Sequence, residues 1–325
     1  MTLPTKVSIG IVTWNCAEVI GRCLECVRAQ RLPGIDLLVV DNHSTDGTRA
    51  ILTAATSDSE RLFLDANTGF SAAHNRAIRQ TTGTYYLALN PDVFLSGDFL
   101  DRLVETMELD GSLGAATGKL LLADSPERLD SAGIYMVPAL RHLDRGQGEL
   151  DGGQYGRQEL VFGASGAAAL YRRAMLDDVT IGGEVFDEDF FAYREDADLA
   201  WRAQLMGWRC AYVPAAVALH RRVVTPGRRA RVPAAINRMS VRNRFLLRVK
   251  NQTGGHFLRY LIPATWRDLQ VVSYCLLRER SSLPAFGEVA RLLPRMWRKR
   301  RQIMARRRAR GQEINRWFAR QSQPM

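Results

Sequence analysis

Six acidic residues lie close together in one stretch of this 325-residue chain, and three of them stand where a helix is expected to begin. A helix N-terminus favours negative charge, but six acids are more than one helix start uses. A partly buried carboxyl among aromatic side chains has a raised pKa and suits general-base catalysis. Helix capping remains the alternative role. The acids are Asp187, Glu188 and Asp189 in FDEDFFAY, and Glu195, Asp196 and Asp198 in REDAD.

Polar, turn-forming residues follow each of four predicted strands. Asn, Asp and Gly also occupy turns for purely local reasons, so each case alone is weak evidence. Ligands of open α/β sheets bind outside the carboxyl ends of the strands, so the coincidence at four successive strand ends indicates a ligand site. The groups are Trp14-Asn15, Asp41-Asn42, Asn67-Thr68-Gly69-Phe70 and Asn90-Pro91-Asp92.

Three residues suit the binding of a nucleotide diphosphate. Asp41 can accept hydrogen bonds from a base N–H or from ribose hydroxyls. Asp92 can hold a hard divalent cation that keeps phosphate oxygens and water as its other ligands. His220 closes an apolar run, and imidazole is a common metal ligand, although a lone histidine also suits packing. A turn remains the alternative role for Asp92, and a turn or a helix cap for Asp41.

Alternating apolar patterns predict the scaffold that positions these residues. The order strand, helix, strand at the N-terminus indicates a β-α-β unit with a parallel sheet. Continued alternation is typical of an α/β domain. Helices are expected at 47–55, 71–81 and 193–206, and strands at 7–13, 35–40, 61–64 and 85–89.

The motifs taken in order resemble family 2 glycosyltransferases with the GT-A fold, in particular a bacterial rhamnosyltransferase-like branch. The resemblance covers about residues 5–222 and implies a mixed, mainly parallel sheet flanked by helices. It also implies an inverting transfer of a sugar from a nucleotide diphosphate. The motifs are VSIGIVTWN, VVDNHSTDGT, NTGFSAAHN, ALNPDV, GAAALYRR, FDEDFFAYREDADLAWRAQLMGW and His220.

The resemblance also implies roles for individual residues. Asp196 matches the catalytic base, beside Glu195, and a divalent metal (Mg²⁺ or Mn²⁺) is expected at Asp92 and His220. Asn90 stands where the family's D-x-D signature has its first acid, which leaves fewer carboxylates for the metal. Residues expected beside the donor nucleotide are Thr13, Asn15, Asp41 at the base, Asn67, Gly69, Asn75 and Asn90.

The charge is divided unevenly along the chain. Residues 1–220 carry 19 Lys+Arg against 30 Asp+Glu, whereas residues 221–325 carry 26 against 4. We therefore expect a GT-A catalytic domain at 1–225 and a basic, amphipathic helical region at 226–325. Arginine and aromatic residues on such helices suit an anionic membrane surface. A solvated helical pair packed on the body is the alternative, and nucleic acid is not expected because no recognised nucleic-acid module accompanies the charge.

Five cysteines without paired spacing favour a reducing compartment. A signal peptide is not expected from the first residues, and no apolar run reaches spanning length. The expected location is therefore the cytoplasm, at the inner face of the cell membrane.

The resemblance implies dTDP-rhamnose as the leading donor, with galactose, glucose or N-acetylhexosamine as the alternative sugars. The expected acceptor is a glycan or a polyprenyl-diphosphate-linked molecule. A dehydrogenase is disfavoured because the first strand lacks a G-x-G-x-x-G turn. The alternatives are an inactive sugar- or lipid-binding scaffold and a nucleotidyltransferase, although the latter would need a Gly-rich, basic loop near the N-terminus.

Overall fold

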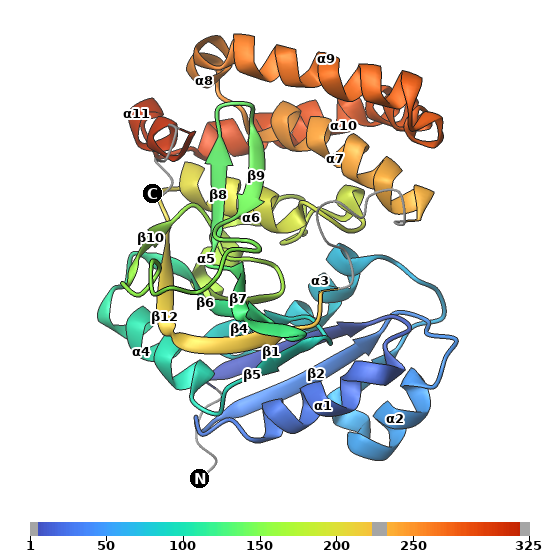
Figure 1. The fold of residues 1–325 in the computed structure, drawn as a ribbon, viewed down its shortest axis with the longest axis vertical. Coiled ribbons are helices and arrows are strands. Elements are labelled where there is room, and N and C mark those ends of the chain that lie inside the picture. The colour runs from blue at the N-terminus through green and yellow to red at the C-terminus, as the bar shows by residue number, and fades with distance from the viewer. Residues whose placement is uncertain (1–5, 223–232, 319–325) are drawn as a thin grey trace.

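A ten-stranded sheet forms the centre of the chain in the computed structural model, which describes residues 6–222 and 233–318 (Figure 1). The strand order is β10-β12-β6-β11-β4-β1-β2-β3, with β5 paired to β12 and β7 paired to β6. A separate hairpin consists of β8 and β9. The strands are β1 Val7–Thr13, β2 Ile35–Asp41, β3 Arg61–Phe63, β4 Tyr85–Leu89, β5 Val93–Leu95, β6 Leu113–Leu122, β7 Ser125–Ser131, β8 Ile134–Val137, β9 Arg141–Asp144, β10 Glu159–Val161, β11 Ala168–Arg172 and β12 Arg209–His220.

The sheet is mixed, as expected, but it contains more antiparallel pairing than a mainly parallel sheet would have. Strands β1 to β4 pair in parallel, which confirms the β-α-β reading of the N-terminus. Strand β11 runs antiparallel to both β4 and β6, so it joins the first half of the sheet to the second. The polar region at 111–157 supplies β6 to β9, whose short apolar pieces carried no clear strand signal.

Side chains alternate between two cores, one on each face of the sheet. In β4, Tyr85 and Leu87 belong to one core, while Tyr86 and Ala88 belong to the other. This alternation follows from the two-residue period of a strand. Gly10 on the neighbouring β1 makes room for Tyr86, because a Cβ at Gly10 would lie 1.9 Å from the Tyr86 hydroxyl oxygen.

Helices cover both faces of the sheet, and the C-terminal helices stack beyond α6 on the face away from α1 and α2 (Figure 1). In the described residues no helix is long and apolar enough to cross a membrane. The helices are α1 Ala17–Arg28, α2 Thr48–Ala55, α3 Phe70–Gln80, α4 Phe99–Leu109, α5 Arg173–Val179, α6 Glu195–Leu205, α7 Ala234–Asn251, α8 Gly254–Arg259, α9 Leu261–Leu277, α10 Pro284–Arg306 and α11 Gly311–Asn315.

Helix α6 begins at Glu195, two residues later than the pattern predicted. Tyr193 and Arg194 have φ angles of 68° and 73°, which a right-handed helix does not accept. The proposed domain boundary near Thr225 falls outside the described residues.

Buried ion pairs connect the C-terminal helices to the part of the chain that precedes them. Lys250 of α7 pairs with Asp187 and, at 2.7 Å, with Asp198 of α6. Lys299 of α10 reaches Asp187 at 2.5 Å and Asp189 at 2.9 Å. Part of the acid cluster noted in the sequence thus neutralises lysines of the basic region. These acids are structural partners of α7 and α10.

Candidate functional site

Two adjoining cavities lie at the ends of β1 and β4. Their volumes are about 780 and 430 Å³, and they share one wall. Asp92 belongs to this wall, so one carboxylate faces both cavities. The shared residues are Phe70, Asn90, Asp92, Ala192 and Tyr193.

The larger cavity is lined by several of the residues expected beside a nucleotide. Asn15, Asn67, Gly69 and Asn90 all contribute to its wall. Asn15 has a φ of 50° and accepts a hydrogen bond from the Thr45 N–H at 2.8 Å, which fixes the turn after β1. The expectation that a ligand site lies at the carboxyl ends of the strands therefore holds for these four residues, which line the cavity.

Three expected nucleotide residues do not reach the cavity wall. Asp41 is fully buried and takes hydrogen bonds from the Thr13 hydroxyl, the Ser44 N–H and the Arg49 guanidinium. Thr13 is equally buried, because its hydroxyl is committed to Asp41. Asn75 points into the protein, where its amide bonds both the N–H and the carbonyl of Phe186. These three side chains hold the loops around the cavity, and Asn42 lines it next to Asp41.

Asp92 and His220 meet through the register of two strands. Strand β5 runs antiparallel to β12 with Val93 opposite His220, which brings His220 Nε2 to 3.4 Å from Asp92 Oδ1. That Asp92 oxygen is buried and has no hydrogen-bond partner. An unpartnered carboxylate oxygen beside an imidazole nitrogen fits a divalent cation that takes its remaining ligands from a diphosphate. No cluster of three or more potential protein ligands occurs in the part of the chain that the structure describes.

A second carboxylate orients His220. Asp130 of β7 is fully buried and lies 2.7 Å from His220 Nδ1, which directs Nε2 towards Asp92. Burial lowers the pKa of His220, but the hydrogen bond to Asp130 and the nearby carboxylate of Asp92 outweigh it and raise that pKa to about 9. Arg222 bridges Asp130 to Asp144 at 2.6 and 2.9 Å. Asp130 carried no signal in the sequence, because it lies inside a strand that itself went unrecognised.

Glu195 and Asp196, here called the acid pair, line the smaller cavity. Asp196 accepts hydrogen bonds from the Gly166 N–H at 3.1 Å and the Ala197 N–H at 2.7 Å. Burial, aided by the charge of Asp144, raises the pKa of Asp196. Burial and the neighbouring Asp196 charge raise the pKa of Glu195 to about 8, and one buried oxygen of Glu195 has no partner. Each Asp196 oxygen retains a lone pair that can receive a proton.

The loop before the acid pair has an unusual backbone. Phe191, Tyr193 and Arg194 all have φ angles between 64° and 73°, a region that costs bulky residues of order 1–3 kcal/mol each. Asn243 of α7 holds this loop, because its side-chain amide donates to the carbonyls of Phe190, Ala192 and Tyr193 at 2.8–2.9 Å. Asn243 did not stand out in the sequence.

Gly69 lets this strained loop approach the start of α3. A Cβ at Gly69 would lie 2.6 Å from the ring of Phe191, and the φ of Gly69 is 86°. The Ser71 N–H donates to the Phe191 carbonyl at 3.2 Å. The two loops therefore meet beside the larger cavity, and only glycine fits at their contact.

Comparison with known proteins assigns the family. Residues 8–180 match the sequence profile of glycosyl transferase family 2. The chain belongs to glycosyl transferase family 2. The family resemblance drawn from the motifs is thereby confirmed.

Relatives of this family 2 protein include a rhamnosyltransferase and a polysaccharide synthase. N-acetylglucosaminyl-diphospho-decaprenol L-rhamnosyltransferase of Mycobacterium tuberculosis is 29% identical over 250 residues, which are 67% of this chain and 76% of that protein. Poly-beta-1,6-N-acetyl-D-glucosamine synthase of Staphylococcus aureus is 23% identical over 220 residues, which are 64% of this chain and 48% of the synthase. The chain thus spans about half the length of several of the curated relatives it matches.

The fold also matches that of a solved glycosyltransferase. The mannosyltransferase PcManGT from Pyrobaculum calidifontis, in complex with GDP-Man and Mn²⁺, aligns with a TM-score of 0.54 at 18% identity. The alignment covers 94% of this chain and 86% of that chain. The GT-A fold expected from the sequence is therefore confirmed.

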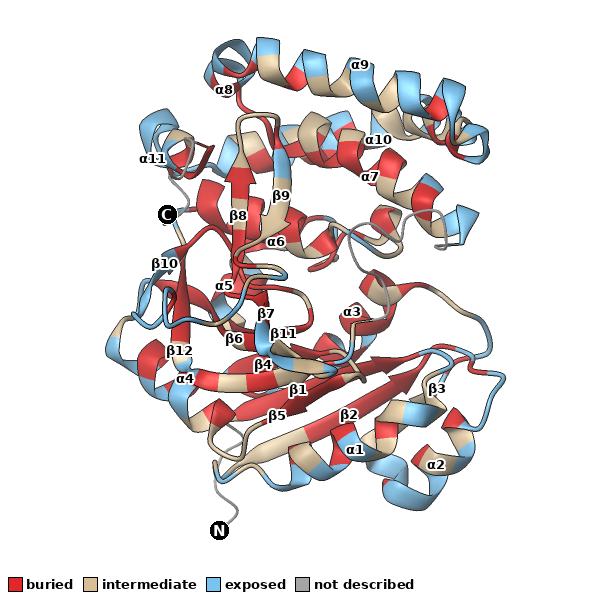
Figure 2. Cartoon of the chain, viewed as in Figure 1, coloured by how far each residue is buried: buried red, intermediate tan, exposed pale blue. Residues whose placement is uncertain are grey.

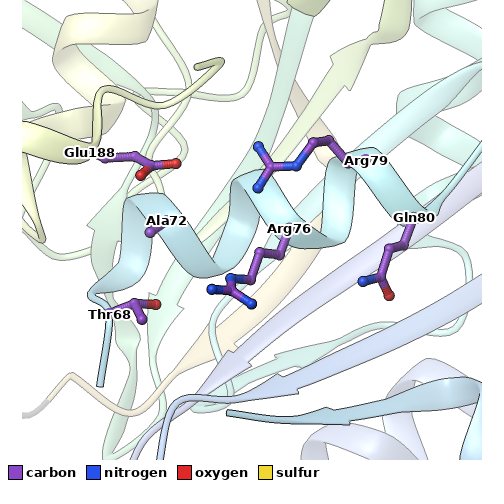
Figure 3. Close-up of a pocket in the computed structure, with 6 residues that line it drawn as sticks. All are labelled: Thr68, Ala72, Arg76, Arg79, Gln80 and Glu188. Carbon is purple, nitrogen blue, oxygen red and sulfur yellow. The ribbon is translucent and has the colours of Figure 1, made fainter. Parts of the chain in front are cut away.

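A third cavity of this family 2 protein lies along the outer side of α3. Its volume is about 460 Å³, and Figure 3 shows Arg76 and Arg79 projecting from α3 with Glu188 on a neighbouring segment. Both arginines are exposed, so water screens their charges. The acid pair and Asp92 do not line this cavity, and we place the chemistry in the other two.

Proposed function

We propose that this chain is an inverting glycosyltransferase that moves a sugar from a nucleotide diphosphate to an acceptor hydroxyl. The observation that carries the proposal is that Asp92 lies on the wall between the two cavities. Asparagines expected beside a nucleotide line the larger cavity, and Glu195 and Asp196 line the smaller one. A donor in the larger cavity and an acceptor in the smaller one would meet at this wall. Such an arrangement suits a single displacement between two bound substrates.

In this proposal Asp196 is the general base. It would take the proton of the acceptor hydroxyl while that oxygen attacks the anomeric carbon from the side opposite the leaving nucleotide. Its raised pKa supports the role, because an efficient base has a pKa close to the working pH. Glu195, whose pKa burial raises to about 8, would hold its own proton at neutral pH. The Gly166 and Ala197 N–H groups favour the charged form of Asp196, which would be the charged member of the pair.

A divalent cation, Mg²⁺ or Mn²⁺, would be held by Asp92 and by His220, whose Nε2 would give up its proton as the cation binds. When bound, such a cation neutralises the charge of a diphosphate leaving group. Asp130 would keep His220 Nε2 turned towards it. With Asn90 in place of a carboxylate, the protein contributes few charged ligands, and donor oxygens would complete the coordination.

For the donor pocket, we propose that Asn15, Asn67, Gly69 and Asn90 contact the nucleotide directly. Asp41, with Thr13, would act on the base through Asn42, which follows Asp41 in the chain and lines the cavity. Asn75 would contribute by fixing helix α3, since its amide is occupied by the backbone of Phe186 and the carboxylate of Glu188.

The finer substrate proposal is transfer of L-rhamnose from dTDP-rhamnose to a polyprenyl-diphosphate-linked or glycan acceptor of a cell-surface polysaccharide. The name of the mycobacterial relative, which shares 29% identity, contains an L-rhamnosyl group and a diphospho-decaprenol acceptor. It therefore supports the proposed sugar and the proposed polyprenyl-linked acceptor.

We further propose that the protein works in the cytoplasm at the inner face of the cell membrane, with its basic C-terminal region on the lipid. The five cysteines, all free, suit a reducing compartment. The excess of 26 Lys+Arg over 4 Asp+Glu in residues 221–325 suits an anionic surface.

The test is a panel of nucleotide sugars with the full-length protein and Mn²⁺ or Mg²⁺, read by release of the nucleoside diphosphate in the presence of acceptor. We expect turnover with one nucleotide class and its loss in Asp196→Asn, with donor binding retained. Donor binding without any turnover would favour the inactive scaffold instead. Release of inorganic diphosphate from a nucleoside triphosphate and a sugar phosphate would favour the nucleotidyltransferase.

A further inference from the structure

Exposed apolar side chains concentrate on the outermost helices of this protein. Of the sixteen large hydrophobic residues that are exposed in the described part of the chain, nine lie between residues 257 and 277. Figure 2 shows that α9 is mostly exposed and forms the outer layer of the C-terminal helices. Clustering of this kind on a surface marks an interaction site.

Helix α9 exposes its apolar face to solvent, whereas an ordinary surface helix buries that face. Ile262, Trp266, Leu269 and Leu276 follow one another at intervals of four, three and seven residues, so they share one face. All four are exposed, with Ile262 at 82% and Trp266 at 65%. A helix that only covers a soluble protein turns such residues inward.

The opposite face of α9 carries its small and acidic residues. Ala264 and Cys275 are buried there. Asp268, the only acid of α9, pairs with Arg244 of α7 at 3.0 Å and with Arg248. These contacts fix the rotation of the helix, so the apolar face is held outward by the fold.

Arginines flank the apolar face at both ends. Arg259 precedes α9, and Arg278 and Arg280 follow it; all three are exposed. None of the three forms a salt bridge within the described residues. Lipid phosphates would complement these charges while the apolar residues enter the interface, and tryptophan is favoured at that depth.

We propose that this face, defined by Ile262, Trp266, Leu269 and Leu276 with the flanking arginines, docks on an anionic lipid bilayer. The inference rests on the membrane partner of the proposed function and identifies the surface that meets it. A second copy of the chain fits less well, because arginines at both ends would oppose arginines of the partner in either orientation.

Helix α7 links the docked helix to the smaller cavity. Ser240 of α7 lines that cavity, and Arg244, one turn later, holds Asp268 of α9. A bilayer under α9 is therefore connected through one rigid helix to the cavity proposed for the acceptor. This suits an acceptor carried on a membrane lipid.

The experiment is vesicle sedimentation of the full-length protein with phosphatidylcholine alone and with phosphatidylcholine mixed with phosphatidylglycerol. Wild type should bind the mixed vesicles, and Ile262→Glu/Trp266→Glu should reduce the bound-to-free ratio at least about tenfold. Arg259→Gln/Arg278→Gln should reduce it by about fivefold per arginine. The matched control is Leu109→Glu, at an equally exposed leucine of α4 (84%) outside the face, and it should bind as wild type does.

Three results would overturn the proposal: absence of wild-type binding to the mixed vesicles, unchanged binding of the Ile262→Glu/Trp266→Glu variant, or dimers in light scattering that this variant abolishes. Turnover with a water-soluble acceptor, measured in parallel, is expected to be equal in all these variants. It separates a failure of docking from a failure of the proposed transfer reaction.

Discussion

The side-chain amide of Asn243 donates a hydrogen bond to the carbonyl oxygen of Tyr193 at 2.8 Å. Tyr193 lies two residues before the acid pair, whereas Asn243 lies on α7 in the C-terminal region. The same amide also reaches the carbonyls of Phe190 and Ala192. One side chain of the basic region thus supports the strained loop that aims Glu195 and Asp196.

Replacement of the Asn243 side-chain amide should lower kcat of the folded enzyme. In Asn243→Asp a carboxylate would face three carbonyl oxygens, so the loop would move, and a shift of about 1 Å near reacting groups costs about 10²-fold in kcat. Steady-state kinetics with separate kcat and donor KM provide the measurement. We expect kcat to fall and donor KM to change little.

Asn251 provides the matched control for that experiment. It is also buried on α7, but its amide donates to Asp198 Oδ1 and the Leu247 carbonyl instead of to the loop. Asn251→Ala should lower the melting temperature while kcat of the folded enzyme stays near wild type. Equal losses of kcat in both variants would show that Asn243 has only a general structural role.

The base assignment predicts a specific loss in Asp196→Asn. General-base catalysis contributes about 10² to 10⁴ in rate, so turnover should fall within this range. Nucleoside diphosphate binding, followed by calorimetry, should be unchanged because Asp196 lines only the smaller cavity. A variant with near-normal turnover would contradict the assignment.

The high pKa of Glu195 predicts a dependence of stability on pH. Burial raises this pKa from 4.5 to about 8, so the folded protein keeps a proton that the unfolded chain releases above pH 4.5. The free energy of unfolding should therefore decrease as pH rises from about 5 to 8. Glu195→Gln should flatten this slope in urea unfolding, whereas Glu127→Gln at an exposed position should retain it.

Asp130 should control metal affinity through His220. Loss of a carboxylate that orients a metal-binding histidine costs about 10- to 100-fold in affinity. Titration of Asp130→Asn with Mn²⁺, followed by electron paramagnetic resonance without substrate, measures this loss directly. Asp144→Asn removes a partner of Arg222 but no contact to His220, so its affinity should stay close to that of wild type.

The buried lysine of α10 should contribute strongly to stability. Lys299→Met would leave Asp187 and Asp189 without this partner, and breaking a buried ion pair from one side costs about 3–5 kcal/mol. Urea unfolding gives the comparison with Arg102→Met, which removes an exposed i,i+4 pair with Asp98. Arg102→Met should lower the free energy of unfolding by less than about 1 kcal/mol.

Local patterns in the sequence were sufficient to predict the strand ends and the asparagines that line the larger cavity. Asn15 and Asn90 follow strands whose apolar runs are plain, so their location followed from topology alone. Whether a strand-end side chain faces the cavity depends on its partners, and Asp41 turned inward because Thr13 and Arg49 hold it.

Contacts between distant segments could not be predicted in this way. His220 and Asp130 are 90 residues apart, and only the pairing of β6 with β7 and β12 brings them together. The left-handed residues before α6 are neither glycine nor asparagine, so nothing in their types signalled the turn. Their conformation depends on Asn243, which lies about 50 residues later.

The pairing of Lys299 with Asp187 spans 112 residues, and it sets the order in which the site can be completed during synthesis. A chain leaves the ribosome from its N-terminus, so the sheet and the acid pair emerge well before α10. Until Lys250 and then Lys299 arrive, Asp187 lacks its buried counter-charges. The framework behind Glu195 and Asp196 is therefore complete only after the residues up to Lys299 have been translated.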